Sequence, residues 1–147
     1  MAVTAKWYTL ASSGQWGGSP VNWVTDTIRC ALITSSYNPS QDTHQYFSTP
    51  QANETSGTGY TAGGMALTGN IVGGVTGTHT IPLKASSTVW NNVTLVCRYA
   101  VVYKDTGTAS SSPLLGWVDF GSNQTVSSGT LSVAWDQTMG VLSLSAA

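Results

Sequence analysis

The sequence predicts an all-β fold, an antiparallel β-sandwich or jelly roll formed by one domain. Two observations lead to this prediction. Runs rich in β-branched and aromatic residues recur along the chain, and apolar side chains alternate within them as they do along strands. Turns containing many of the sixteen glycines separate these runs at nearly regular spacing, which is typical of sandwiches and jelly rolls. A chain of 147 residues can bury a sizeable core without disulfides or metals.

The clearest element is a hairpin over residues 94–121. In its first strand the alternate residues from Leu95 to Tyr103 lie on one side, and the mostly apolar residues between them lie on the other. A second strand, from Leu114 to Phe120, follows a polar loop at 105–112. Since both faces are apolar for much of their length, another part of the chain, or another chain, must supply the second cover.

The N-terminal segment, residues 1–21, is expected to form an irregular arm with at most one short strand. Three glycines and a proline interrupt it, at Gly14, Gly17, Gly18 and Pro20. The sandwich domain then spans residues 22–147. The arm either folds back on its own domain or reaches a neighbouring subunit. In the second case, removal of residues 1–20 would leave a folded monomer.

The domain opens with a predicted strand over residues 23–33 and a turn that contains Pro39. One short helix is expected near 42–48, where Ser40 or Asp42 can serve as the N-cap. No other helix is predicted.

The remaining strands are predicted over 58–67, 78–84, 88–95, 129–135 and 140–144, with a glycine-broken hairpin over 69–77. Pro82 confines its strand to a sheet edge or a bulge, because proline cannot donate to the hydrogen-bond ladder. The glycine-rich segment 57–64 is interpreted as turns that require positive φ, since it does not match the dinucleotide-binding fingerprint.

Composition excludes several classes of partner. Charged residues make up 7% of the chain, against about 25% in an ordinary soluble domain, and the net charge is −1. Such a chain offers no electrostatic attraction to nucleic acid or to an anionic membrane, and no apolar run is long enough to span a bilayer. The N-terminus does not resemble a secretory signal. Short Ser, Thr and Gly side chains suit a surface that packs against neighbours, and they suit an extracellular domain equally well.

No cofactor or metal site is predicted. Cys30 and Cys97 are expected to be buried free thiols, with a disulfide between them open only if their strands lie about 5.5–6 Å apart, and their spacing fits no zinc site. His44 and His79 lie on different elements without further ligands at metal-binding spacing, so a surface or capping role is expected for both.

The acidic residues indicate structural roles, and the chain is not expected to be an enzyme. Four of the six lie in turn or cap contexts, where aspartate bonds to nearby backbone groups: Asp26, Asp42, Asp105 and Asp136. Asp119 is expected to form a structural ion pair with Arg98, or else with Lys104, across the hairpin. No pair of carboxylates, catalytic triad or nucleophile elbow can be assembled.

Six Trp and six Tyr in a chain of this length are a functional signal. Exposed aromatic side chains either stack on sugar rings or anchor protein interfaces. Three of them fall on predicted strands and are expected in the core: Trp90, Trp117 and Trp135. Four near the N-terminus are the candidate interface residues: Trp7, Tyr8, Trp16 and Trp23.

Five sequence blocks carry a more specific signal. In chain order they read DTIRCALITSSYNPSQDTHQYF, NETSGTGYTAGGMALTG, VWNNVTLVCRYAVVYKDTG, PLLGWVDFG and WDQTMGVLSL. In order and spacing these blocks, which cover about residues 22–145, resemble a group of small tailed-phage virion structural proteins. The resemblance implies a phage context and brings no catalytic residues with it.

Within that context, low charge and many aromatic residues favour a capsid decoration, or cement, protein. The expected partners are the major capsid protein and further copies of the chain in a homotrimer, with no nucleic acid and no membrane. The expected location is the outer surface of the capsid, after assembly in the host cytoplasm. Two alternatives stay open: a tail or head–tail structural protein, and a glycan-binding module.

Overall fold

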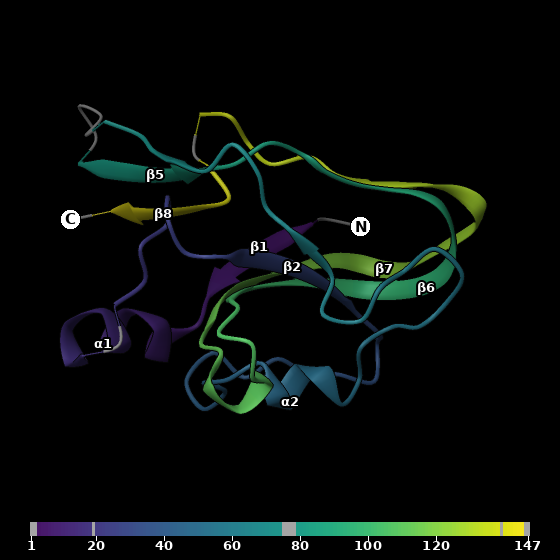
Figure 1. Cartoon of the computed structure of the whole chain (residues 1–147), viewed down its shortest axis with the longest axis horizontal. Coiled ribbons are helices and arrows are strands. Elements are labelled where there is room, and N and C mark those ends of the chain that lie inside the picture. The colour runs from purple at the N-terminus through teal and green to yellow at the C-terminus, as the bar shows by residue number, and fades with distance from the viewer. Residues whose placement is uncertain (1–2, 19, 75–78, 139, 146–147) are drawn as a thin grey trace.

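The fold is built from two antiparallel sheets, which confirms the predicted all-β class (Figure 1). A computed structural model describes residues 3–18, 20–74, 79–138 and 140–145. The larger sheet has the strand order β1 (Thr4–Trp7), β7 (Leu114–Val133), β6 (Thr88–Lys104), β2 (Ile28–Ile33) and β3 (Met65–Ala66). The smaller sheet has the order β4 (Ile71–Val72), β5 (Thr80–Lys84) and β8 (Leu142–Ser145). In Figure 1 the layer of β5 and β8 lies above the larger sheet.

The hairpin of β6 and β7 is the predicted central element, and it is longer than predicted. Its strands have 17 and 20 residues, and the polar loop between them holds a single 3-10 turn, Ala109–Ser111. The strands predicted over 88–95 and 129–135 are the outer ends of this same hairpin. Asn92 and Ser128, which adopt positive φ, lie where the register shifts. The turn-like residues there form bulges that bend the hairpin without ending it.

Both faces of the inner half of the hairpin are covered by the chain itself. On one face Phe47 stacks on Tyr103 with ring centroids 3.9 Å apart. On the other face Gly116 pairs with Val102, and a Cβ added to Gly116 would lie 2.6 Å from the Leu142 side chain of β8. Towards the outer half of the hairpin this second cover ends, and Val96 of β6 is left 42% exposed.

The N-terminal segment has the short strand that the prediction allows, but a helix replaces the predicted irregular arm after it. β1 is an edge strand of the larger sheet, paired with β7 from Thr4↔Asp119 to Trp7↔Gly116, and α1 (Thr9–Gly17) follows it. The glycines do not prevent the helix: Gly14 lies within it, and Gly18 caps its end with φ of 104°. Sheet pairing and tertiary contacts outweigh the weak local propensity of this segment.

The predicted helix near 42–48 lies slightly later in the chain, as α2 (Ser48–Gln51). Neither Ser40 nor Asp42 caps it, since Phe47 occupies the N-cap position. Asp42 instead accepts a hydrogen bond from the Thr9 hydroxyl, 2.6 Å away, at the start of α1. A tertiary contact therefore uses the side chain that the sequence offers as a cap.

Two predicted strands are shorter in the structure. Residues 23–27 turn before β2, because the Asp26 amide donates to the Asn22 carbonyl and the Asp26 carboxylate accepts from the Asn22 amide. Of the strand predicted over 58–67 only β3 forms. Part of the hairpin predicted over 69–77, and Thr78, lie outside the described residues; β4 pairs with β5.

Pro82 lies in the central strand of the smaller sheet, so its predicted edge position is wrong. The Pro82 carbonyl accepts from the Gly73 amide on the side of β4. A strand residue directs its N–H and its carbonyl to the same side, so the missing N–H also faces β4. The ladder to β4 has only two residue pairs and ends at Val72↔Leu83, which leaves this position without a required donor.

The glycine-rich segment 57–64 packs directly on the backbone of the larger sheet. A Cβ added to Gly57 would lie 2.0 Å from the Thr94 carbonyl oxygen, and one added to Gly64 would lie 2.0 Å from that of Cys30. Gly64 also adopts φ of 73°. The segment is rich in glycine because only glycine permits this close approach.

Candidate binding groove

Three of the four candidate interface aromatics line one hollow in the surface. Trp7, Trp16 and Trp23 surround a space of about 760 Å³ between α1, the 20–26 segment and the smaller sheet. Trp16 is 92% exposed, whereas Trp23 is 3% exposed. Tyr8, the fourth candidate, is fully buried and packs in the core of its own chain. The structure therefore buries Tyr8 and nearly all of Trp23, and leaves Trp7 half-buried and Trp16 exposed.

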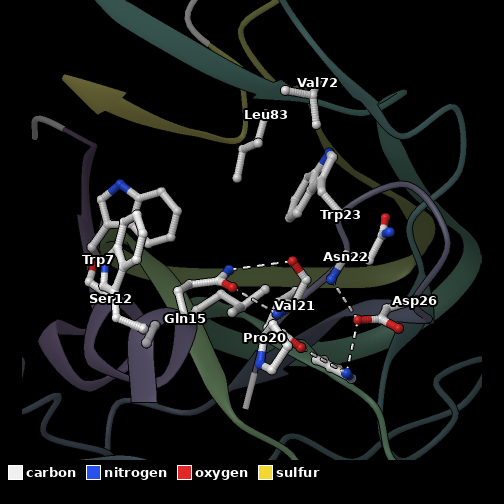
Figure 2. A pocket seen from close by; sticks show the side chains of 14 residues that line it. Trp7, Ser12, Gln15, Pro20, Val21, Asn22, Trp23, Asp26, Val72 and Leu83 are labelled. Atoms are coloured by element: carbon white, nitrogen blue, oxygen red, sulfur yellow. Dashed lines mark hydrogen bonds and ion pairs between the residues drawn. The ribbon is translucent and has the colours of Figure 1, made fainter. Parts of the chain in front are cut away.

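The walls of this hollow come from segments far apart in the sequence. We call it the indole groove and define it by Trp7 of β1, Gln15 and Trp16 of α1, residues 20–23 and Asp26, Val72 of β4, Leu83 of β5, Lys104 of β6 and Leu115 of β7. Figure 2 shows Trp7 and Trp23 on opposite sides, Leu83 and Val72 above, and Gln15 and Val21 below. The groove lies where both sheets and α1 meet.

The two inner indoles are held in place by the backbone. The Trp7 Nε1–H donates to the Ser143 carbonyl of β8, and the Trp23 Nε1–H donates to the Lys84 carbonyl of β5, both at 2.9 Å. Each bond ties a side chain to the smaller sheet. Both indole N–H groups are satisfied, so the surface that these rings leave open to the groove, nearly all of it from half-buried Trp7, is apolar.

Polar contacts fix the 20–26 segment below the indoles (Figure 2). The Gln15 Oε1 accepts from the Val21 amide at 2.8 Å, which joins α1 to this segment. The Asp26 carboxylate accepts from the Asn22 amide at 2.7 Å and lies 2.9 Å from Lys104 Nζ. Burial raises the pKa of the Asp26 carboxyl, but the hydrogen bonds from Lys104 and Asn22 outweigh it and hold this pKa below its usual range. Asp26 is therefore ionised at neutral pH, and its negative charge balances the positive charge of Lys104.

Tyr8 lies at the buried end of a hydrogen-bond chain. Its hydroxyl is 2.7 Å from that of Tyr37, which is 2.8 Å from His44 Nδ1. The Ser40 amide donates to the same nitrogen at 3.3 Å, so Nδ1 acts as an acceptor and the imidazole is neutral. Burial raises the pKa of Tyr37 to about 12 and lowers the pKa of His44. This chain anchors the β1–α1 junction to the 37–44 loop.

The structure pairs Arg98 with Asp119. Arg98 Nε lies 3.1 Å from Oδ1 and Nη2 lies 3.3 Å from Oδ2, a two-pronged contact between β6 and β7. The same Oδ1 accepts from the Gly121 amide. Hydrogen bonding to Arg98 is the main cause that lowers the pKa of Asp119. Lys104, the alternative partner predicted for Asp119, pairs with Asp26 instead.

The remaining acidic residues have structural partners. Asp105 accepts from the Gly107 amide and pairs with Arg29 at 2.7 Å, and Asp136 accepts from the Thr138 amide. Glu54 accepts from the Tyr60 hydroxyl and the Gly63 amide, both at 2.6 Å. Burial raises the pKa of Glu54, although these hydrogen bonds act in the opposite sense. Each of these carboxylates bonds to a turn, a tyrosine or an arginine.

Cys30 and Cys97 are free and buried, as predicted. Burial raises the pKa of both thiols, that of Cys97 to about 11. Neither is a reactive thiolate at neutral pH. Within the described part of the chain, no three His, Cys, Asp or Glu side chains gather as metal ligands.

Sequence reasoning did not identify Gln15, Asp26, Lys104, Val72 or Leu83 as members of a site. Nothing in the local sequence marks them, because the groove exists only once strands from both sheets meet α1. Of the groove residues, the sequence singled out only Trp7, Trp16 and Trp23, as candidate interface aromatics.

Among the described residues, no helix is both long and apolar enough to cross a bilayer. Comparisons of the chain with protein-family models, with curated proteins and with solved structures found no match.

Proposed function

We propose that this chain is a phage virion structural protein, of the capsid decoration type. In this proposal it binds the major capsid protein on the outer surface of the mature head as a homotrimer. The resemblance of its five sequence blocks to small tailed-phage proteins gives the context. The observation that carries the proposal is an open face on the outer half of the β6–β7 hairpin.

We call this surface the ribbon face and define it by Thr94, Val96 and Arg98 of β6 and Thr125 of β7. Val96 pairs with Thr125, so their side chains share a face, and Val96 is 42% exposed. The inner half of the hairpin is covered on both faces, but this part is not. The same strands therefore continue beyond the cover that their own chain supplies.

The chemistry of the ribbon face suits a protein interface. Short, β-branched side chains lose little conformational entropy when a partner orders them. Its Arg98 is already paired with Asp119, so docking leaves no isolated charge to desolvate. The chain carries few other charges that would repel a neighbour.

Decoration would stabilise a head by mass action. A protein that binds the expanded shell, and not its dissociated subunits, shifts the equilibrium towards the intact shell. A trimer presents three copies of each contact, so modest single contacts combine into firm attachment. No chemical step is required.

The test is binding of the purified protein to heads that lack it, together with its mass in solution by light scattering across a hundredfold dilution. We expect a trimer that binds heads and raises the temperature at which they release DNA. Val96→Lys should weaken binding or trimerisation. Val24→Lys, which changes a valine 55% exposed in the 22–26 turn, is the matched control.

Absence of the protein from purified heads, or heads equally stable without it, would refute the decoration role. Its presence in tails would support the alternative of a tail or head–tail protein instead. Equal binding by both lysine variants would remove the ribbon face from the interface.

A further inference from the structure

We propose that the indole groove is a saccharide-binding site that accepts neutral pyranose rings. This inference does not depend on the proposed capsid role, which uses the ribbon face. The groove has the size of a small-molecule site, since its volume of about 760 Å³ lies within the usual few hundred to a thousand Å³. It is also bounded on several sides, by both sheets, α1 and the 20–26 segment.

The aromatic surface that a ligand can reach comes from half-buried Trp7 and exposed Trp16, and it matches the apolar faces of a sugar ring, while Trp23 is almost fully buried and backs the groove. Trp7 and Trp23 lie across the groove from one another, with Leu83 above them (Figure 2). Aromatic rings carry negative charge density on their faces, which attracts the polarised C–H groups of a pyranose. Trp16 also lines the groove and is 92% exposed, so a large apolar surface is left open to a ligand.

The polar groups of the groove select a neutral, hydroxylated ligand. Asp26 and Lys104 form an ion pair, so the polar wall has donors and acceptors but no net charge. Hydroxyl groups can donate to the carboxylate and accept from the ammonium group. A purely apolar chain would cover this pair and return no hydrogen bond, at a desolvation cost. A polyanion would find one cation, already neutralised by Asp26.

The groove is formed before any ligand arrives. Backbone carbonyls hold Trp7 and Trp23, and Gln15 holds Val21. Little side-chain entropy remains to be lost on binding, apart from that of exposed Trp16. A preformed site compensates for the weak contact that each sugar ring makes.

Affinity electrophoresis of the full-length protein tests the proposal, with dextran, mannan and galactan as neutral polysaccharides and alginate as an anionic one. We expect at least one neutral polysaccharide to retard the protein, and alginate not to. Trp16→Ala should weaken binding about three- to tenfold, the effect of losing one stacking contact. Trp16→Phe, which keeps a ring, should retain part of the affinity. Since Trp16 is 92% exposed, both variants should fold.

Val96→Ala, on the ribbon face, is the control and should bind polysaccharide as the wild type does. The proposal is overturned if no neutral polysaccharide retards the protein, if alginate does so instead, or if Trp16→Ala binds unchanged. The two proposals fail separately. Trp16→Ala should still bind heads, and Val96→Lys should still bind polysaccharide. Loss of head binding in Trp16→Ala, without polysaccharide binding by any variant, would make the groove a protein-docking site.

Discussion

At the scale of single residues, His44 gives this protein a pH dependence. Its Nδ1 accepts hydrogen bonds from Ser40 and from the Tyr37 hydroxyl, so protonation at that nitrogen would break both. Burial lowers the pKa of His44 in the folded state below its usual value near 6.5. The unfolded chain therefore takes up the proton more readily than the folded one.

The expected outcome is a loss of stability on mild acidification. The contribution of His44 is fully present above about pH 6.5 and declines as pH falls towards its lower folded pKa. Glu54 acts in the opposite sense, because its raised pKa adds stability as pH falls. Thermal unfolding between about pH 7.5 and 5.5 should therefore be compared in wild type and His44→Gln. Parallel curves for the two proteins would contradict this role for His44.

At Gly64 the surrounding backbone requires glycine. We expect Gly64→Ala to reduce the free energy of unfolding by about 2 kcal/mol or more, because a positive φ is strained and the new Cβ meets the Cys30 carbonyl. Gly74→Ala is the matched control, since a Cβ there meets nothing within 4 Å. Urea denaturation of both variants measures the difference. Equal midpoints would show that the 57–64 segment can move away from the sheet without cost.

At the scale of elements, β1 and Tyr8 make the N-terminal segment part of the fold. Removal of residues 1–20 would expose the edge of β7 and delete a fully buried aromatic side chain. Loss of such a side chain alone typically costs about 3–5 kcal/mol, a large part of the stability of a single domain. We therefore expect the truncated chain to unfold or aggregate, and not to remain a folded monomer.

Circular dichroism and size-exclusion chromatography of the truncated protein would check this expectation. Full-length Trp16→Ala is the control, because it changes the same segment at an exposed position and should keep the sheet signal. A truncated protein with an intact β spectrum and a cooperative transition would show that β1 is dispensable.

At the scale of the whole molecule, charge contributes little to stability. The ion pairs of Arg29, Arg98 and Lys104 have side chains that are a quarter to a third exposed, where solvent screens them. We expect the melting temperature to change by less than about 3 °C between about 0.05 M and 1 M NaCl. Scanning calorimetry would measure it, with KCl as a control for ion-specific effects. A steep fall with salt would give these pairs a larger role.

The sequence by itself determined the all-β class, the β6–β7 hairpin with its polar loop, and the burial of both thiols. These features follow from side-chain alternation and local turn chemistry, which neighbouring residues encode. It also singled out Arg98, Asp119 and the N-terminal Trp residues. The low charge of the surface is likewise a property of composition alone.

Only the tertiary structure decided where the N-terminal segment lies, which strand holds Pro82 and how the groove forms. β1 pairs with a strand more than a hundred residues later in the chain, and no local pattern encodes such a partner. The sequence predicts the same interface role for Tyr8 and Trp16, two aromatic residues near the N-terminus, yet Tyr8 is fully buried and Trp16 is 92% exposed. That difference depends on packing between distant segments, because exposure is a property of the assembled surface and not of the residue.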